Sequence, residues 1–217
     1  MSVPVLSTQK AMESAARVSR FGNPTPPGIP QILSMYYVAY ESSVRGIADT
    51  PISSCGGELL AMVPRAFAEE LHITGSGRFL GGGFVNQDVC DCDEGHFNCF
   101  ILVDSAMGAP EHPLRPFSSA SSNLFPIGTT MIVHELVGLT LPNGQHHDGC
   151  VQIDDYNYED GPELFSLFVN KEGSANYIGE KLGGIHSSIR VEVTNCTPRE
   201  YADRYLRPIA MLTFLFK

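Results

Sequence analysis

Short runs of apolar, β-branched and aromatic residues recur along the chain from about residue 34 and are separated by glycine, proline and asparagine. Runs of this length between turn residues are typical of β-strands. In chain order they are SMYYVAYESS, GRFLGGGFV, CFILVDS, TTMIVHEL, LTLPNGQ, GCVQIDD, LFSLFV and SSIRVEV. Because no long helical pattern separates them, they predict a mainly β domain with one core, built as a small barrel or sandwich.

Three segments depart from the strand pattern. PRAFAEELHI opens with Pro64 and continues with good helix formers, which predicts a short helix over residues 64–71. TPREYADRYLRPIAML places Thr197 and Glu200 as a capping box, so we expect a C-terminal helix that Pro208 ends or kinks. Near the N-terminus, a short helical pattern precedes GNPTPPGIPQ, whose four prolines predict a strap or linker.

The charge balance restricts the possible partners. The formal net charge is -10 and no cluster of lysine and arginine is present, which argues against nucleic acid or an anionic lipid surface as the main partner. The longest apolar run, IAMLTFLF, has eight residues, whereas a membrane-spanning helix needs about 20. The N-terminus has no signal-peptide pattern, so we expect a cytoplasmic protein, or a secreted one if a signal peptide preceded Met1.

Six cysteines leave the redox state and the disulfide pairing open, because six cysteines allow 15 connectivities. Three of them lie with His96 in the segment CDCDEGHFNC, a composition that raises the question of zinc. Only one residue separates Cys90 from Cys92, whereas paired thiolates of structural zinc sites are usually two to four residues apart. A loop pinned by a disulfide is the favoured interpretation, and we predict no metal and no cofactor.

The order of the strand-like segments resembles the three-aspartate (3D) domain, a double-psi β-barrel found in lytic transglycosylases of the membrane-bound A type and in related wall enzymes. The most specific matches are PIGT at 126–129, the HDGC segment and the aspartate that ends the following strand. The resemblance covers roughly residues 35–193. It implies a six-stranded double-psi β-barrel with short peripheral helices, flanked by an N-terminal extension (1–34) and a C-terminal helical extension (194–217).

The resemblance also implies a set of site residues. Asp104 matches the first family aspartate and Asp155 the third, which acts as general acid and base on the glycosidic oxygen. Asn123 stands nearest to the place of the second, and Asp154 is a supporting neighbour. Substrate binding is assigned to residues around the acids and near the barrel mouth, namely Tyr156, Tyr158, Tyr40 and His147.

General acid catalysis near neutral pH requires a carboxyl group with a raised pKa, which burial or a like charge supplies. Alternation along a strand sends the side chains of Asp154 and Asp155 to opposite faces. We expect Asp155 to point into the cleft, with Asp104 beside it as the perturbing or orienting carboxylate. Asp154 is then expected to be solvated or to cap a turn.

Three functions remain open. The first is a glycan-active enzyme, either a lytic transglycosylase or a glycoside hydrolase, working by metal-independent aspartate catalysis. The absence of tryptophan, which sugar clefts favour, leaves a second: a repurposed barrel enzyme that cyclises or isomerises a hydrophobic small molecule in specialised metabolism. The third is a non-catalytic, expansin-like binding or effector protein. An enzyme acting on a glycan or a hydrophobic small molecule is favoured.

Overall fold

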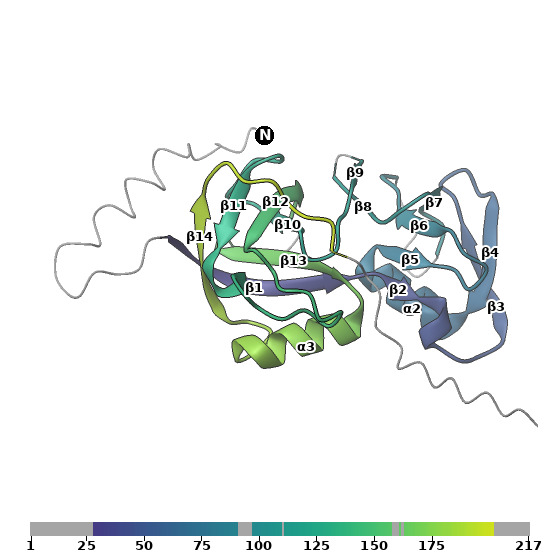
Figure 1. Cartoon of the computed structure of the whole chain (residues 1–217). Coiled ribbons are helices and arrows are strands. Elements are labelled where there is room, and N and C mark those ends of the chain that lie inside the picture. The colour runs from purple at the N-terminus through teal and green to yellow at the C-terminus, as the bar shows by residue number, and fades with distance from the viewer. Residues whose placement is uncertain (1–27, 91–96, 110, 158–160, 162, 202–217) are drawn as a thin grey trace, which may run out of the picture.

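Six strands close into a barrel in the computed structural model, which describes residues 28–90, 97–109, 111–157, 161 and 163–201. Their order around the barrel is β1-β13-β10-β12-β11-β14 (Figure 1). The bounds are β1 (Ile29–Tyr37), β10 (Ser119–Ser122), β11 (Thr130–Val133), β12 (Cys150–Asp155), β13 (Leu164–Asn170) and β14 (Ser188–Val193). Strand β1 is parallel to β13 and β10 to β12, and the other neighbours are antiparallel. The predicted mainly β class is confirmed.

The barrel has an apolar core because alternate residues of its strands face inward. Val151 and Ile153 of β12 lie in this core together with Phe165 and Leu167 of β13, and none of the four is exposed to solvent. Helix α3 (Glu172–Leu182) packs against β1 and β13 and adds Ile178 to the same core. The barrel and α3 therefore form one packed unit.

A second region follows β1 in the chain and lies beside the barrel (Figure 1). We call residues 39–103 the insert. Its elements are β2 (Ala39–Tyr40), a 3-10 helix (Glu41–Ser43), β3 (Ala48–Ser53), β4 (Leu59–Pro64), α2 (Arg65–Thr74), β5 (Ser76–Arg78), β6 (Phe84–Gln87) and β7 (Phe100–Val103). Strands β2, β5, β6 and β7 form one sheet, and β3 pairs with β4.

The insert has a hydrophobic core of its own, in which Phe67 and Leu71 of α2 pack against Ile52 and Val85. The expectation of a single core is therefore wrong. The runs GRFLGGGFV and CFILVDS, which have the composition of barrel strands, pair with each other in the second sheet. Strand-like composition does not reveal which sheet a strand joins, since that depends on contacts between distant segments.

The helices confirm one prediction and correct another. Helix α2 is present as predicted, one residue after Pro64, and ends at Gly75, whose φ of 69° is left-handed. Helix α3 was not predicted from the sequence. It ends at Gly183, whose φ of 86° is left-handed. The C-terminal helix predicted to begin at Thr197 is not found in residues 194–201, the part of this segment that the structure describes. Residues 202–217, which include Pro208, lie outside the described residues. In the described part of the chain, no helix is long and apolar enough to cross a membrane.

Strand β1 begins earlier than the sequence predicts. Its first residue, Ile29, lies inside the predicted extension 1–34, while the helical pattern before residue 28 lies outside the described residues.

Between the insert and β10, the short strands β8 (Met107–Gly108) and β9 (His112–Pro113) pair as a hairpin. A 3-10 helix (His134–Leu136) follows β11. The β8–β9 hairpin matters most, because it lies against the end of β12.

Candidate functional site

The two adjacent aspartates end β12, where the pairing of this strand with β10 is irregular. Ala120 pairs with Ile153, but the next residue of β10, Ser121, pairs with Asp155. Asp154 is therefore the extra residue of a β-bulge. Bulges re-aim side chains at the ends of barrel strands and are frequent beside active sites. Here the bulge gives the two carboxylates different surroundings.

Asp155 is half-buried and is held by backbone groups. Its Oδ1 accepts hydrogen bonds from the N–H of Ala109, just after β8, at 2.9 Å and from the N–H of Tyr156 at 2.8 Å. Burial raises the pKa of Asp155 against the lowering effect of these two bonds, and the charge of Asp154 raises it further. Among the described residues, no group donates a hydrogen bond to Oδ2. Asp155 thus combines a fixed orientation with a carboxyl oxygen that can carry a proton.

Asp154 is buried, with 1% of its surface exposed, so the expectation of a solvated or turn-capping acid is wrong. Its Oδ2 accepts hydrogen bonds from the Ser119 hydroxyl and from the Arg115 guanidinium, the latter at 2.9 Å, and its Oδ1 accepts one from the Gln152 amide at 2.7 Å. The guanidinium forms an ion pair with the buried carboxylate. A carboxylate with a cation and two further donors is stable in its charged form. We therefore interpret Asp154 as a fixed negative charge behind Asp155.

The β8–β9 hairpin approaches the acid pair so closely that only glycine fits at residue 108. A Cβ atom there would lie 2.5 Å from the Asp154 carbonyl oxygen and 3.0 Å from Asp155 Cβ. Contacts this short are forbidden for any other residue without a backbone shift. Gly108 therefore allows the following N–H, that of Ala109, to reach Asp155.

Asn123 lies beside the segment that follows Asp155. Its Oδ1 accepts a hydrogen bond from the backbone N–H of Asn157 at 3.2 Å, and the Asn157 amide donates to the Ser166 hydroxyl at 3.2 Å. Tyr156 is about half exposed. Both residues are exposed and lie at the segment that follows Asp155, whereas Tyr158 lies outside the described residues.

Asp104 is the first residue after β7 of the insert and is exposed, and no hydrogen bond or ion pair to it occurs within the described ranges. Burial raises the pKa of Asp155 most, and the charge that raises it further is that of Asp154. The perturbing role expected of Asp104 is therefore found for Asp154, whereas the place of Asp104 beside Asp155 stays a prediction.

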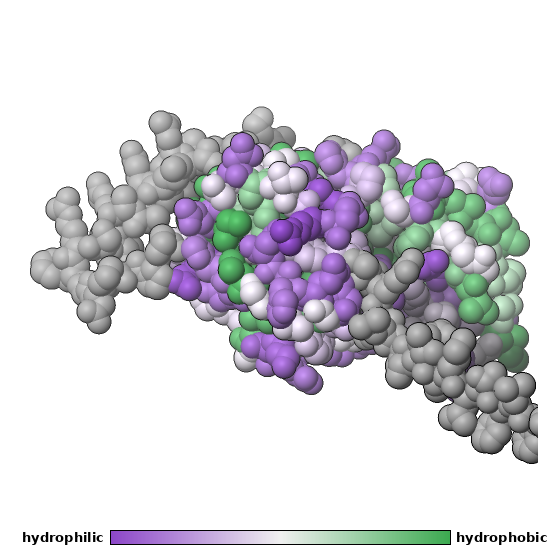
Figure 2. All heavy atoms as spheres, in the orientation of Figure 1, coloured by the Kyte–Doolittle hydropathy of each residue, from purple (hydrophilic) through white to green (hydrophobic). Residues whose placement is uncertain are grey.

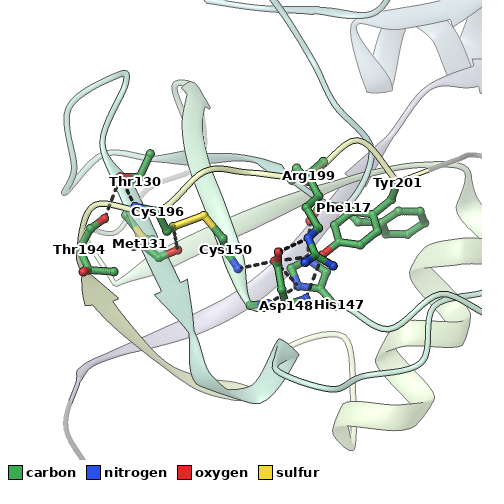
Figure 3. Close-up of a disulfide and its surroundings, with 12 residues drawn as sticks. Phe117, Thr130, Met131, His147, Asp148, Cys150, Thr194, Cys196, Arg199 and Tyr201 are labelled. Carbon is green, nitrogen blue, oxygen red and sulfur yellow. Dashed lines mark hydrogen bonds and ion pairs between the residues drawn. A yellow bond between two sulfur atoms is a disulfide. The ribbon is translucent and has the colours of Figure 1, made fainter.

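His147, expected to bind substrate, is 1% exposed and belongs to a buried cluster near the C-terminal segment (Figure 3). Its Nε2 is 2.6 Å from the Phe117 carbonyl oxygen, and its Nδ1 accepts the N–H of Gly149 at 2.7 Å. The Tyr201 ring stacks on it at 4.8 Å. With both ring nitrogens bonded to the backbone, His147 stabilises the fold, and we leave it out of the proposed site.

The same cluster explains why residues 194–201 are not helical. The Cys150–Cys196 disulfide ties this segment to β12 (Figure 3). Beyond the disulfide, Asp148 holds the segment: Arg199 pairs with its carboxylate at 2.8 Å and the Tyr201 hydroxyl donates to it at 3.0 Å. The Ser118 hydroxyl donates to the Arg199 carbonyl oxygen at 2.5 Å. These contacts hold residues 194–201 in a non-helical conformation, and they outweigh the local preference for a helix that the capping box provides.

Tyr40, expected to bind substrate, lines a pocket whose lining includes neither Asp154 nor Asp155. The pocket has a volume of about 560 Å³ and lies between the insert and the start of α3, with Tyr40, Glu70 and Glu172 in its lining. Burial, then the charge of Glu172, raises the pKa of Glu70. The Lys171 ammonium lies 5.5 Å from the centre of the Tyr40 ring. Tyr40 also packs, together with Tyr36, against the small apolar cluster that contains Phe168, and its contact with substrate stays a prediction.

One residue beside the acids was not expected from the sequence. Tyr36 of β1 has a buried hydroxyl group that bonds to no group in the described ranges. Burial raises its pKa strongly, and the charges of Asp155 and Asp154 raise it further. Its ring packs against Phe168 at 5.3 Å. The strand pattern SMYYVAY shows two adjacent tyrosines but not which of them faces the acids.

No protein-family model matches the sequence, and no curated protein matches it. Among solved structures, E. coli MltA with bound chitohexaose is similar, with a TM-score of 0.51 and 15% identity over 78% of this chain and 72% of that chain. A membrane-bound lytic murein transglycosylase from Agrobacterium tumefaciens has a TM-score of 0.50 and 10% identity over 76% and 74%. At these identities the likeness establishes the fold. The resemblance to lytic transglycosylases of the membrane-bound A type is confirmed at that level.

Proposed function

We propose that this protein is a glycan-active enzyme of the lytic transglycosylase or glycoside hydrolase type, built on a double-psi barrel, with Asp155 as its general acid and base. The observation that carries the proposal is the state of Asp155. It is a half-buried, backbone-held carboxyl group with a raised pKa at the end of a barrel strand. The shared fold supports the glycan substrate, because one structure of that fold contains bound chitohexaose. Fold alone does not assign chemistry, so the argument depends on the carboxyl group.

The proposed reaction uses Asp155 twice. Protonated Oδ2 donates its proton to the glycosidic oxygen as the bond from this oxygen to the anomeric carbon breaks, which leaves positive charge on that carbon. The resulting carboxylate then takes a proton from the attacking hydroxyl group. In transglycosylation the sugar's own hydroxyl attacks, and in hydrolysis a water molecule does. One carboxyl group is enough for the first route.

The groups around Asp155 favour both its protonated form, which acts as the acid, and its carboxylate form, which acts as the base. Burial raises the pKa of Asp155, and the nearby carboxylate of Asp154, paired with Arg115, raises it further, which favours the protonated acid. The two backbone N–H groups on Oδ1 stabilise the carboxylate once the proton has left. We propose Asn123 and Tyr156, which lie at the segment that follows Asp155, as groups that contact the sugar. No feature of the described residues favours the small-molecule or effector functions.

The decisive experiment incubates the full chain, and separately Asp155→Asn, with peptidoglycan and with chitohexaose. Mass spectrometry of the released sugars then distinguishes the two routes, because an intramolecular attack gives a product lighter by one water than hydrolysis does. We expect release by the unmodified chain and its loss in Asp155→Asn. If both release sugar equally, Asp155 is not the acid. If the correctly folded chain releases none, the glycan proposal fails.

A further inference from the structure

The pocket between the insert and the start of α3 has the size of a ligand site. Its volume of about 560 Å³ lies within the roughly 300–1,000 Å³ that small-molecule sites occupy, and such sites are frequent where two packed regions meet. The side chains that give it its chemistry are Tyr37, Tyr40, Glu70, Lys171 and Glu172. Two carboxylates and two aromatic rings therefore share one concave surface.

Tertiary contacts bring these side chains together. The Val38 N–H donates to the Asn170 carbonyl oxygen at 3.2 Å, which holds the start of the insert beside the end of β13. Asn170 has a left-handed φ of 63°, which asparagine tolerates better than most residues, and it turns the chain into α3. Helix α2 packs against β2. Glu70 of α2 and Glu172 of α3 consequently line the same pocket.

The pocket has negative charge that is not neutralised at Glu70. This residue is half-buried, and within the described ranges no hydrogen bond or ion pair reaches its carboxylate. Burial raises the pKa of Glu70, and the charge of Glu172 raises it further. Burial, then the charges of Glu172 and Glu70, also raises the pKa of Tyr37. A cation in the pocket would relieve this repulsion, and the net charge of -10 attracts cations from a distance.

An ammonium group of the chain itself indicates which kind of cation suits the pocket. The Lys171 ammonium lies 5.5 Å from the centre of the Tyr40 ring, a distance typical of cation–π interactions. A metal ion is less suited, because the lining contains no histidine or cysteine. Its two carboxylates also supply only part of the six to eight oxygen ligands that calcium takes. The aromatic wall and the paired acids favour an organic ammonium ion.

We propose that this pocket binds an organic primary amine, with the ammonium group held between the carboxylates of Glu70 and Glu172. An ammonium group has three hydrogen-bond donors, so it can bond to both carboxylates at once. Ser42 and Ser43 line the exposed part of the pocket and offer hydroxyl groups to a polar ligand body. The lining includes neither Asp154 nor Asp155, so the inference goes beyond the proposed glycan reaction and does not rest on it.

Isothermal titration calorimetry of the full chain at neutral pH and low salt tests the proposal. The probes are glucosamine and pentane-1,5-diamine, and their uncharged counterparts are N-acetylglucosamine and pentane-1,5-diol. We expect at least one amine to bind, at least about tenfold more tightly than its counterpart, because hydrogen bonds between charged groups are the stronger ones. The proposal is overturned if neither amine binds, if charge makes no difference, or if calcium chloride binds and the amines do not.

Two changes on α2 distinguish the pocket from general attraction to an acidic protein. Glu70→Gln should weaken amine binding at least about tenfold. Glu69→Gln is the matched control, because it removes the same charge from the next residue, whose carboxylate pairs with Arg65 on the exposed face. Its dissociation constant should equal that of the unmodified chain. Equal weakening in both variants would show that the amine binds to the overall negative charge and not in the pocket.

A third change should have the opposite sign. In Lys171→Met the chain loses the ammonium group that competes with the ligand for the Tyr40 ring, so amine binding should become about two- to fivefold tighter. Loss of folding would weaken binding, so tighter binding cannot be explained that way. Unchanged or weaker binding in the folded variant would contradict the assigned place of the ammonium group. The glycan proposal does not depend on any of these outcomes.

Discussion

The barrel and the insert bury different kinds of side chain. Among the described residues, every buried polar side chain lies in the barrel, in α3 or in a segment that adjoins them. The set is Gln31, Ser118, Ser119, Ser121, Ser122, His147, Asp154, Ser166, Asn170 and Ser174. The buried side chains of the insert are all apolar. The insert instead exposes large apolar residues such as Leu59 and Met62 of β4. Figure 2 shows hydrophobic surface on the side of the molecule where Figure 1 draws β3 and β4.

The difference shows what a closed sheet allows. A barrel has no edge strands, so its backbone groups are paired and its segments can hold polar side chains in fixed hydrogen bonds. Asp154, with Arg115 and Ser119, is such an arrangement. The insert consists of small open sheets and takes additional support from sulfur links between its loops. Acid–base chemistry is therefore expected in the barrel, and four experiments test this assignment.

The largest expected effect is on activity. Asp155→Asn should lower sugar release by roughly 10²- to 10⁴-fold, the usual contribution of a general acid. The asparagine keeps an oxygen for the two N–H donors, so folding is retained. Asp104→Asn, which changes the exposed aspartate directly after the insert, is the control and should have little effect. Equal losses in the two variants would mean that Asp104 takes part in the chemistry.

Removing a core phenylalanine should separate the two regions. Phe165→Ala in the barrel and Phe67→Ala in the insert each remove a side chain with no exposed surface, at a cost of about 3–5 kcal/mol. Hydrogen exchange measured by mass spectrometry should show that Phe67→Ala loosens the insert and leaves barrel amides protected. A loss of protection spread over both regions by Phe67→Ala would mean that they unfold as one unit.

Breaking the buried ion pair should cost less than the phenylalanine changes but still clearly destabilise the barrel. Arg115→Met leaves the carboxylate of Asp154 buried without its cation, which we expect to lower the free energy of unfolding by about 3 kcal/mol. In the insert, Arg65 pairs with Glu69 on the exposed face of α2. Arg65→Met should cost under about 0.5 kcal/mol in the same urea titration. Similar costs would contradict the contrast between the regions.

The smallest effect concerns pH. Because the pKa of Asp155 is raised in the folded state, its contribution to stability is present below its ordinary pKa and is lost as the pH rises through the raised value. Asp155→Asn should therefore gain stability relative to the unmodified chain at neutral pH, with the difference vanishing in acid. Urea unfolding at several pH values measures it. Asp104→Asn, which loses the same charge at an exposed position, should show no such trend.

Local patterns predicted much of the barrel and only part of the site. The run GCVQIDD is β12, LFSLFV is β13 and SSIRVEV is β14, because alternation and turn residues determine strands locally. Helix α3, with two glycines in EGSANYIGEKL, has weak helix propensity, and its apolar residues become helical by packing on the barrel. The acid pair was found from its adjacency, but Asp154, which was expected to be solvated, is buried. The bulge and Arg115 decide that point, and neither has a local signal.

The sequence by itself determined the strand content, helix α2 and the position of the acid pair at a strand end. These features depend on residues that are neighbours in the chain. Only the tertiary structure decided that β6 and β7 leave the barrel, that Gly108 brings the Ala109 N–H to Asp155 and that Cys55 forms a disulfide with Cys90. Each of these depends on contacts between residues far apart in the sequence. Such contacts form only when the whole chain packs, so no local pattern records them.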